Sequence, residues 1–550
     1  MSTSPAGARL LLGPMLRHVG RTTATVWVQT SRPAEVAVLG CRASTFTVCE
    51  QHYALVEVSG LEPGSVTTYQ VHLDGELVWP RPASTWPDSR IRTRRSARES
   101  AKESASPVQV VFCSCRRAKP DDPRLAAAVG ADALDGYATR MATMAPEDWP
   151  DALLLLGDQI YADDPTPQTR RWMDSRRDTT IAPGYEVTDF AEYVHLYLES
   201  WSDPELRWLM STVPTAMIFD DHDVRDDWNT SAAWRERITA APWWPERIRG
   251  ALASYWIYQH IGNLSPQQRH ADPTWRAVCD APGDGDGDAW PVLQKMADAA
   301  DGDLGAISWS FRWDIDGVRL VVMDTRSGRV LTEGRREMLD DEKFSWVDCA
   351  VSEDAHQAVH ILVGSSLPWL LAPAIHDLQS ADELACGRGS ALGERIRQAL
   401  DLEHWAAFRD SFHRLAALLR RVAAGSDAPA TISVLSGDVH HSYVSRADID
   451  GSSVYQLVSS PAHHRVPRYA TVAIRIAWFG PLAAVVRRVV RRFGVADPAL
   501  SWRLLRGPLF GNAVATLMFS GRNAEVIFEK SGPTGRLEPV SRIELSRAGE

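Results

Sequence analysis

The stretch TAMIFDDHDVRDDWN, residues 215–229, ends an apolar run in charged side chains. Residues 215–219 are typical of a buried strand, and Asp220, Asp221, His222 and Asp223 follow at once. An ionised carboxylate is costly to bury unless something pairs with it. Carboxylate and imidazole groups also bind hard and borderline metal ions. The stretch therefore indicates a metal site, with a structural ion pair or a helix N-cap as the alternatives.

Three further apolar runs end in side chains of the same kind. They are residues 108–112 before Cys115, 152–156 before Asp158 and Tyr161, and 432–435 before Asp438 and His440. Thiolate, phenolate, carboxylate and imidazole groups are all metal ligands. Ligand sites in open α/β sheets form at the carboxyl ends of strands. The four strand ends together predict one site, where two neighbouring cations would bridge a water and bind a phosphoryl oxygen.

The elements that must position these residues follow from the pattern of apolar residues. Uninterrupted apolar runs separated by amphipathic stretches are typical of strands buried on both faces in an α/β layered domain, which we expect over residues 108–550. Residues 1–95 alternate apolar and polar positions between frequent turn signals, which predicts a small antiparallel β-sandwich. A polar linker is expected at 96–107 and a closing β-hairpin at 511–530.

Composition narrows the class of protein. The formal net charge of −11 over 550 residues argues against binding nucleic acid by neutralising its phosphates. No signal peptide or twin-arginine pair is visible, and the seven cysteines are few and scattered, as in proteins with reduced thiols. We therefore expect a cytoplasmic protein, with export by an unrecognised route as the alternative.

Two segments have an ambiguous composition. Asp284, Asp286 and Asp288 have the spacing of a calcium loop, but Lys295 stands where that loop needs a glutamate, which favours a solvated acidic loop. Residues 471–495 mix apolar side chains with paired arginines. A membrane surface or a cover over a substrate cleft are alternatives for this segment, and an amphipathic helix packed on the domain is favoured.

Six motifs, taken together, resemble those of the alkaline phosphatase D (PhoD-like) metallophosphatases of the calcineurin-like phosphoesterase superfamily. They are CSC, GDQIYADD, DDHDVRDDW, VVMDTRSGR, LVGSSLPWLL and LSGDVHHS, which lie between residues 108 and about 465. The resemblance implies a four-layer αββα metallophosphatase sandwich preceded by a small immunoglobulin- or fibronectin-like β-sandwich. It also implies a site that holds Fe3+ and Ca2+.

The resemblance assigns roles residue by residue. The implied metal ligands are Cys115 and Tyr161 for iron, Asp158 bridging the metals, Asp221 in place of a superfamily Asn, the late pair Asp438 and His440, and Asp220 as a further ligand. His222 matches the catalytic histidine, placed to protonate the leaving alkoxide. Arg326 and Arg116 are weaker candidates for gripping the phosphate, since a guanidinium fork suits phosphoryl oxygens.

The function expected from these residues is metal-dependent hydrolysis of phosphate monoesters, diesters or both, by a hydroxide that bridges the metals. The expected partner is a small phosphoester. One alternative is a non-catalytic binding protein in which the metals only stabilise the fold. Another keeps a hydrolase but changes the bond, to a nucleotide pyrophosphate or a sulfate ester. Nothing in the sequence predicts the oligomeric state.

Overall fold

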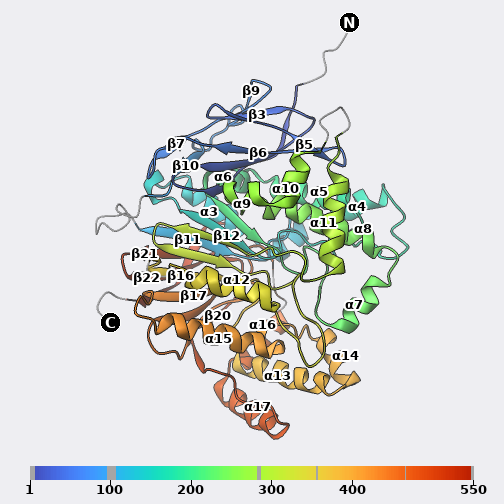
Figure 1. Cartoon of the computed structure of the whole chain (residues 1–550), viewed down its shortest axis with the longest axis vertical. Coiled ribbons are helices and arrows are strands. Elements are labelled where there is room, and N and C mark those ends of the chain that lie inside the picture. Colours follow the sequence, from blue (N-terminus) through green and yellow to red (C-terminus); the bar gives the residue numbers. More distant parts are fainter. Residues whose placement is uncertain are drawn as a thin grey trace.

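The computed structural model describes residues 7–95, 107–281, 287–354, 357–464, 466 and 468–546 of the chain. Two large sheets with helices around them form most of the molecule, and smaller sheets lie at the N-terminal end (Figure 1). The mixed α/β class predicted from the sequence is confirmed. The predicted linker 96–107, apart from residue 107, lies outside the described residues, as do Asp284 and Asp286 of the acidic loop.

The six-stranded sheet carries three of the four predicted strand ends. Its order is β13 (Thr215–Ile218), β12 (Ala152–Leu156), β11 (Val108–Cys113), β21 (Ala513–Ser520), β22 (Asn523–Ser531) and β23 (Leu537–Ser546). The first three strands are parallel, so their carboxyl ends meet at one edge. β21 runs antiparallel to β11 and forms a hairpin with β22, so the C-terminal part of the chain completes this sheet.

The seven-stranded sheet carries the fourth strand end. Its order is β14 (Phe311–Ile315), β15 (Val318–Val322), β16 (His360–Gly364), β17 (Thr431–Ser436), β19 (Ser453–Val458), β18 (Ser442–Ala447) and β20 (Trp502–Leu509). β15, β16, β17 and β19 are parallel neighbours. Their carboxyl ends therefore also lie together.

The strands of the second sheet are buried on both faces because their successive side chains enter two different cores. Leu320 and Val322 of β15 belong to a core shared with the first sheet. Val321, between them, belongs to a core built with Phe344 and Leu415. Those two residues lie on α12 (Asp341–Ser352) and α15 (Arg409–Ala423), which cover the outer face of this sheet. Alternate burial explains why the strand is apolar throughout.

The remaining helices fill the connections between the strands. In chain order they are α2 (Pro123–Val129), α3 (Ala133–Met141), α4 (Pro167–Asp174), α5 (Phe190–Trp201), α6 (Pro204–Thr212), α7 (Ala232–Thr239), α8 (Trp244–Tyr255), α9 (Pro266–Ala271), α10 (Pro273–Cys279), α11 (Trp290–Gly302), α13 (Pro373–Gly387), α14 (Ala391–Ala399), α16 (Arg468–Ala477) and α17 (Gly480–Arg492). Many begin at a side-chain cap. Asp189 caps α5 and Ser231 caps α7, each accepting a hydrogen bond from a backbone N–H of the first turn.

The N-terminal strands form two four-stranded sheets and one strand pair. The first sheet is β1 (Leu10–Val19), β2 (Ala24–Thr30), β6 (Gln51–Val58) and β5 (Phe46–Val48); the second is β4 (Cys41–Ser44), β3 (Glu35–Val38), β8 (Val71–Leu73) and β9 (Glu76–Trp79); the pair is β10 (Arg90–Arg92) and β7 (Val66–Thr68). Asp288 of the acidic loop accepts a hydrogen bond from the backbone N–H of Cys49 in this region, at 3.1 Å.

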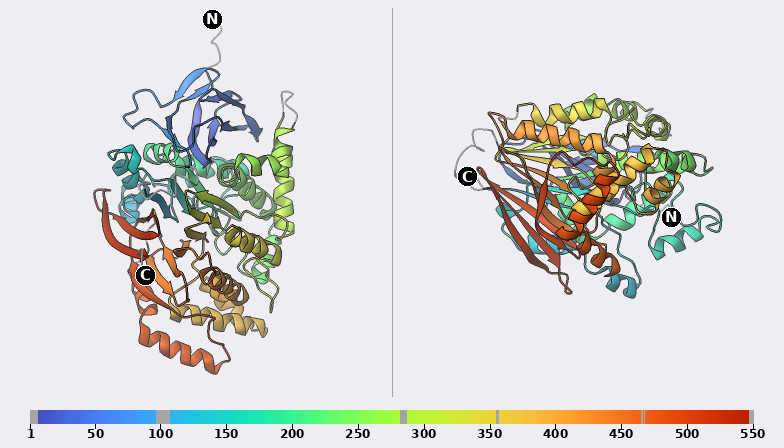
Figure 2. Two further views of the ribbon diagram at one scale, coloured as in Figure 1. Left: turned by 60° about the vertical axis from the view of Figure 1, so that its left-hand side comes forward. Right: turned by 90° about the horizontal axis from the view of Figure 1, so that it is seen from below.

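β2 joins the N-terminal sheets to the rest of the molecule. Val26 and Val28 of this strand lie in a small core of their own, whereas Trp27 points into the main core. Tyr53 of β6 also lies on the inner side, and its hydroxyl is 3.1 Å from that of Tyr258. Figure 2 shows these sheets at one end of the molecule and α17 at the other. The strand-end residues lie between the two.

Candidate metal centre

Loops at the carboxyl ends of the parallel strands hold the candidate ligands in an unusual backbone conformation. Cys115 follows β11, Asp158 follows β12, and Asp438 and His440 follow β17. Their φ angles are +55°, +25°, +64° and +51°, all in the left-handed region that side chains other than glycine rarely adopt. Such strain persists only where the surrounding structure enforces it, and it concentrates at functional sites.

Two groups of candidate ligands share one carboxylate. The ligand atoms of Cys115, Asp158 and His440 all lie within 4.8 Å of one another, and so do those of Asp158, Asp221 and His222. Asp158 belongs to both groups, so one side chain lies within reach of both candidate positions. The bridging role that the resemblance implies for Asp158 stays a prediction.

Tyr161 lies beside the first group. Its hydroxyl donates a hydrogen bond to Oδ2 of Asp158 at 3.3 Å, and its ring lies between those of His222 and His464, with centroids 4.7 Å and 5.5 Å away. Burial, together with the neighbouring anionic groups, raises the pKa of Cys115, Asp158 and Tyr161 well above their usual values. The anionic forms that bind metals are thus costly here without a cation.

A third group of carboxylates faces a cation that the chain itself supplies. Asp220, Asp221 and Asp438 have oxygens within 4.8 Å of one another. Arg326 lies fully buried among them, with Nε paired to Asp220, and with Nη2 3.1 Å from Asp221 and 3.9 Å from Asp438. Its Nη1 pairs with Glu403. Burial nevertheless raises the pKa of Asp220 to about 8, although the Arg326 charge acts in the opposite direction.

The donors of the first two groups fit a metal ion. Oδ1 of Asp158 and Oδ1 of Asp221 are buried and have no hydrogen-bond partner among the residues that the structure describes. A buried carboxylate oxygen without a partner is costly, and a cation would remove that cost. The set of thiolate, carboxylate and imidazole donors suits a transition metal or calcium.

His222 is held by Asp163, a residue of the GDQIYADD motif to which the sequence alone assigned no role. Its Nδ1 lies 2.9 Å from both oxygens of Asp163, and its Nε2 lies 3.9 Å from Asp226. Burial lowers the pKa of His222, but the charges of Asp163 and Asp221 outweigh it, so the pKa is well above its usual value. The side chain is 23% exposed. The raised pKa favours a protonated imidazole, and the side chain is partly accessible.

Other neighbours of the cluster were also missed from the sequence. Nε2 of His404 lies 2.9 Å from Oδ2 of Asp438, and Glu403 beside it holds both Arg326 and Arg329. Glu403 and His404 precede a short 3₁₀ turn, Trp405–Ala407, so no strand end marks them. Asp163, by contrast, lies inside the GDQIYADD motif, and its position five residues after Asp158 was a usable signal.

The two arginines predicted to grip phosphate have other partners. Arg116 is buried, and its guanidinium pairs with Asp132 at 2.7 Å and Asp203 at 2.5 Å, neither of which is among the predicted metal ligands. Arg326 reaches the cluster but is enclosed by its carboxylates. Both predicted phosphate contacts therefore stay predictions, and each would require the guanidinium to leave a carboxylate. Arg117 lies close to a predicted ligand, with its guanidinium 5.3 Å from the centre of the Tyr161 ring.

Comparisons with known proteins agree with the strand-end motifs. The family model for PhoD-like phosphatases matches residues 114–278, and the model of a domain of unknown function, DUF7800, matches residues 7–91. No curated protein matches the chain. The solved structure of PhoD is similar in fold, with a TM-score of 0.56 at 13% identity over 98% of this chain and 94% of that one.

A purple acid phosphatase, PPD1 from yellow lupin (Lupinus luteus) seeds, is similar with a TM-score of 0.50 at 11% identity. That match covers 99% of this chain and 75% of the plant protein. At these identities the two solved structures establish likeness of fold. The resemblance noted from the six motifs is confirmed by the family model over the region that contains Cys115, Asp158, Tyr161 and His222.

Proposed function

From the premise that residues 114–278 carry a PhoD-like phosphatase domain, we propose that this protein is a metal-dependent phosphoesterase. One observation carries the proposal more than any other. Asp158 is shared by two groups of metal-ligating side chains, and His222, whose pKa lies well above its usual value, belongs to the second group. A cation position next to a proton donor is the arrangement that hydrolysis of a phosphoester needs.

The residues of the first group would hold a metal ion through sulfur, oxygen and nitrogen. Cys115, Asp158, Tyr161 and His440 supply a thiolate, a carboxylate, a phenolate and an imidazole. When bound, the metal would activate a water nucleophile and neutralise charge on the phosphoryl oxygens. We propose iron at the position with thiolate and phenolate donors and calcium at the positions with carboxylate donors, because these donor sets suit those ions.

His222 would supply the proton that the leaving group takes up. Asp163 accepts a hydrogen bond from Nδ1–H, which fixes the orientation of the ring and leaves Nε2–H free to donate. As the ester bond to phosphorus breaks, the proton on Nε2 passes to the departing alkoxide oxygen, and the Asp163 carboxylate keeps the Nδ1 proton. The neutral imidazole then regains a proton from water before the next cycle.

We propose that the substrates are small phosphate monoesters, diesters or both. Hydrolysis of a nucleotide pyrophosphate or a sulfate ester is the nearest alternative, because a Lewis-acidic site would serve those bonds as well. A non-catalytic, metal-stabilised protein is the alternative from another class. The Asp163–His222 pair argues against this alternative, because a structural metal site does not need an accessible proton donor beside it.

Two finer features belong to the same proposal. We infer that the two large sheets with their helices form a four-layer αββα metallophosphatase sandwich, which the alternating burial of β15 supports. We also infer that the N-terminal sheets form an immunoglobulin- or fibronectin-like sandwich. We also propose a cytoplasmic location, which the seven unpaired cysteines support.

Replacement of His222 by alanine tests the function against the structural alternative. Wild-type protein and His222→Ala are assayed with a chromogenic monoester and diester, and their metal content is measured by elemental analysis. We expect turnover to fall by roughly 10²-fold or more, the usual contribution of general acid catalysis, with metal content nearly unchanged. Unchanged turnover, or loss of metal and folding together, would favour the non-catalytic protein.

A further inference from the structure

Helix α17 (Gly480–Arg492) stands at the end of the molecule opposite the N-terminal sheets, and α16 (Arg468–Ala477) precedes it in the chain (Figure 2). No single helix in the described part of the chain is long and apolar enough to cross a membrane. Residues 470–477 and 480–492 reach that length and apolar content only when the two helices are taken together, and a bend of 72° separates the helices. This pair of helices is called the basic elbow below.

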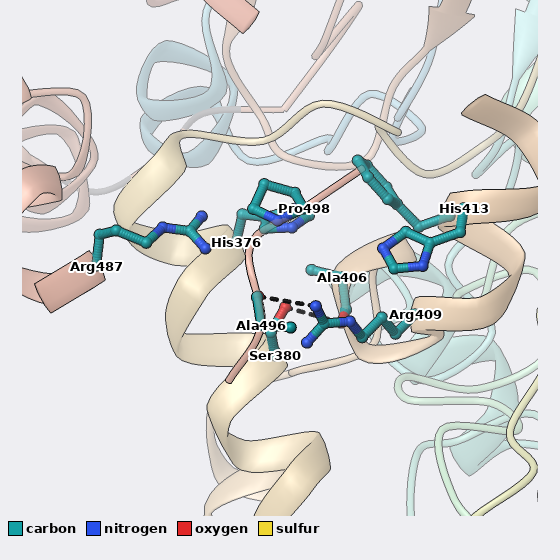
Figure 3. A pocket seen from close by; sticks show the side chains of 9 residues that line it. His376, Ser380, Ala406, Arg409, His413, Arg487, Ala496 and Pro498 are labelled. Atoms are coloured by element: carbon teal, nitrogen blue, oxygen red, sulfur yellow. Dashed lines mark hydrogen bonds between the residues drawn. The ribbon is translucent and has the colours of Figure 1, made fainter. Parts of the chain in front are cut away.

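One face of α17 is fixed to the body of the protein. Arg487 pairs with Asp377 of α13, and the side chain of Val490 is buried. Figure 3 shows the pocket at this junction, where Arg487 points toward His376 while Arg409 approaches the chain after α17. There Arg409 donates a hydrogen bond to the backbone carbonyl of Ala496 at 2.8 Å. The basic elbow is therefore held in place from one side.

The other side of the basic elbow is apolar and exposed. Six of the eighteen large exposed hydrophobic side chains of the described residues lie here, each 47% to 68% exposed: Val472, Ile476, Phe479, Val485, Val489 and Phe493. Val472 and Ile476 are four residues apart on α16, and Val485, Val489 and Phe493 follow one another at intervals of four along α17 and its C-cap, so each set lies along one face of its helix. Apolar side chains clustered in this way mark an interaction surface.

The charge of the basic elbow indicates what this surface binds. Residues 470–495 contain five arginines and no Asp, Glu or Lys, in a chain with a net charge of −11. Arg488 and Arg492 lie beside Val485 and Val489 on the exposed face, and within the described residues neither makes an ion pair. A face that combines apolar side chains with unpaired arginines complements the interface of a membrane that contains anionic lipids.

We propose that the basic elbow docks the protein on an anionic phospholipid surface. The valine and phenylalanine side chains enter the boundary between headgroups and acyl chains, and Arg488 and Arg492 reach the lipid phosphates. The helices lie on the surface instead of crossing it, because α17 is tied to α13 and the five arginines would be costly in hydrocarbon.

The docking surface is connected directly to the candidate metal centre. His464, whose ring stacks on that of His440 with centroids 4.4 Å apart, lies four residues before α16 begins. Trp478, just after α16, contacts the ring of Tyr443 on β18 at 4.9 Å. Docking would therefore hold the centre beside the lipid surface. The proposal itself does not depend on the phosphoesterase activity.

Flotation of the full-length protein with lipid vesicles tests the proposal. Vesicles of phosphatidylcholine alone are compared with vesicles that also contain phosphatidylglycerol, at low and high salt. We expect the wild type to bind only the anionic vesicles and to be released as salt rises, because counterions screen the arginines. Arg488→Gln with Arg492→Gln should weaken binding by about five-fold for each arginine removed.

The apolar side chains are tested separately, in Val485→Ser with Val489→Ser, which should also lose binding. A matched control is Leu392→Ser with Arg395→Gln on α14, where an apolar and a basic side chain are likewise exposed, and this variant should bind as the wild type does. Equal, weak partition of the wild type to both vesicles would overturn the proposal. So would self-association of the wild type in solution that the same valine substitutions abolish, since the surface would then belong to a second copy of the chain.

Discussion

The two halves of the strand-end cluster balance their charge in different ways. Around Asp220, Asp221 and Asp438 the chain supplies its own cation, the buried guanidinium of Arg326. Around Cys115, Asp158 and Tyr161 no ion pair with a Lys or Arg is formed by any described residue, and one carboxylate oxygen has no hydrogen-bond partner there. The chain therefore supplies part of the charge balance in the first half, where Oδ2 of Asp220 and Oδ1 of Asp221 still lack a hydrogen-bond partner among the described residues, and it supplies no such cation in the second.

This difference explains why buried carboxylates follow β13. A buried carboxylate that is paired with a guanidinium of the chain is partly balanced without a metal, whereas one without such a partner depends more on a bound cation. Arg326 thus organises the Asp220 half, and its predicted contact with phosphate stays a prediction. The half around Asp158 is where metal content and activity should respond most strongly to substitution.

The largest effect on stability is expected when the internal cation is removed. Arg326→Met keeps much of the length of the side chain but leaves Asp220 buried without its guanidinium partner, while Glu403 keeps Arg329. Breaking one partner of a buried ion pair costs about 3–5 kcal/mol. Urea unfolding of metal-free protein should show this loss, and added calcium should restore part of it by binding the freed carboxylates.

The matched control for that experiment is Arg42→Met. Arg42 pairs with Glu35 at 2.6 Å, but both side chains are largely exposed, so the expected loss is below about 1 kcal/mol. If Arg326→Met is no less stable than Arg42→Met, the carboxylates of the first half are not balanced by the guanidinium, and the contrast between the halves fails.

A smaller effect, confined to activity, is expected from Asp163→Asn. The Asp163 charge helps to hold the pKa of His222 well above its usual value, so His222 stays protonated into alkaline solution. Without that charge the pKa of His222 falls, and the alkaline decline of kcat should move to lower pH. We expect kcat in alkaline solution to drop by about 10-fold to 10²-fold, with KM little changed.

Asp164→Asn is the control for this substitution. Asp164 is the next residue along the chain, is 46% exposed and pairs with Arg117 and Arg170 instead of with His222. Its pH–rate profile should match that of the wild type. An alkaline limb that stays in place in Asp163→Asn would show that His222 does not donate the proton.

Much of this site was predictable because each strand end is marked in the sequence by an apolar run followed by a metal-ligating residue type. Apolar runs before Cys115, Asp158, Asp221 and Asp438 indicated buried strands, and parallel strands bring their carboxyl ends together. The structure brings Cys115 and Asp221 each into a group with Asp158, and it brings Asp438 into a third group with Asp221.

The partners of these residues were not predictable by the same reasoning. Arg326 lies 106 residues from Asp220 and 77 from Glu403 along the chain, so its choice of carboxylates depends on tertiary contacts. Glu403 and His404 lie in a connection without a periodic pattern. The order of the strands was equally hidden, because β21, which pairs with β11, comes from the C-terminal end of the chain. An alternation of apolar and polar residues could not indicate the strand order either, because both faces of these strands are apolar.

The most direct test of the account is elemental analysis of the purified protein beside Cys115→Ser, with phosphoester hydrolysis measured on the same samples. Cys349→Ser, at an exposed cysteine, is the control. We expect iron in the wild type and in the control. In Cys115→Ser we expect a loss of iron, and a fall in turnover larger than the roughly 10–100-fold that is typical of changes outside the ligand set. Full metal content and turnover in Cys115→Ser would contradict the account.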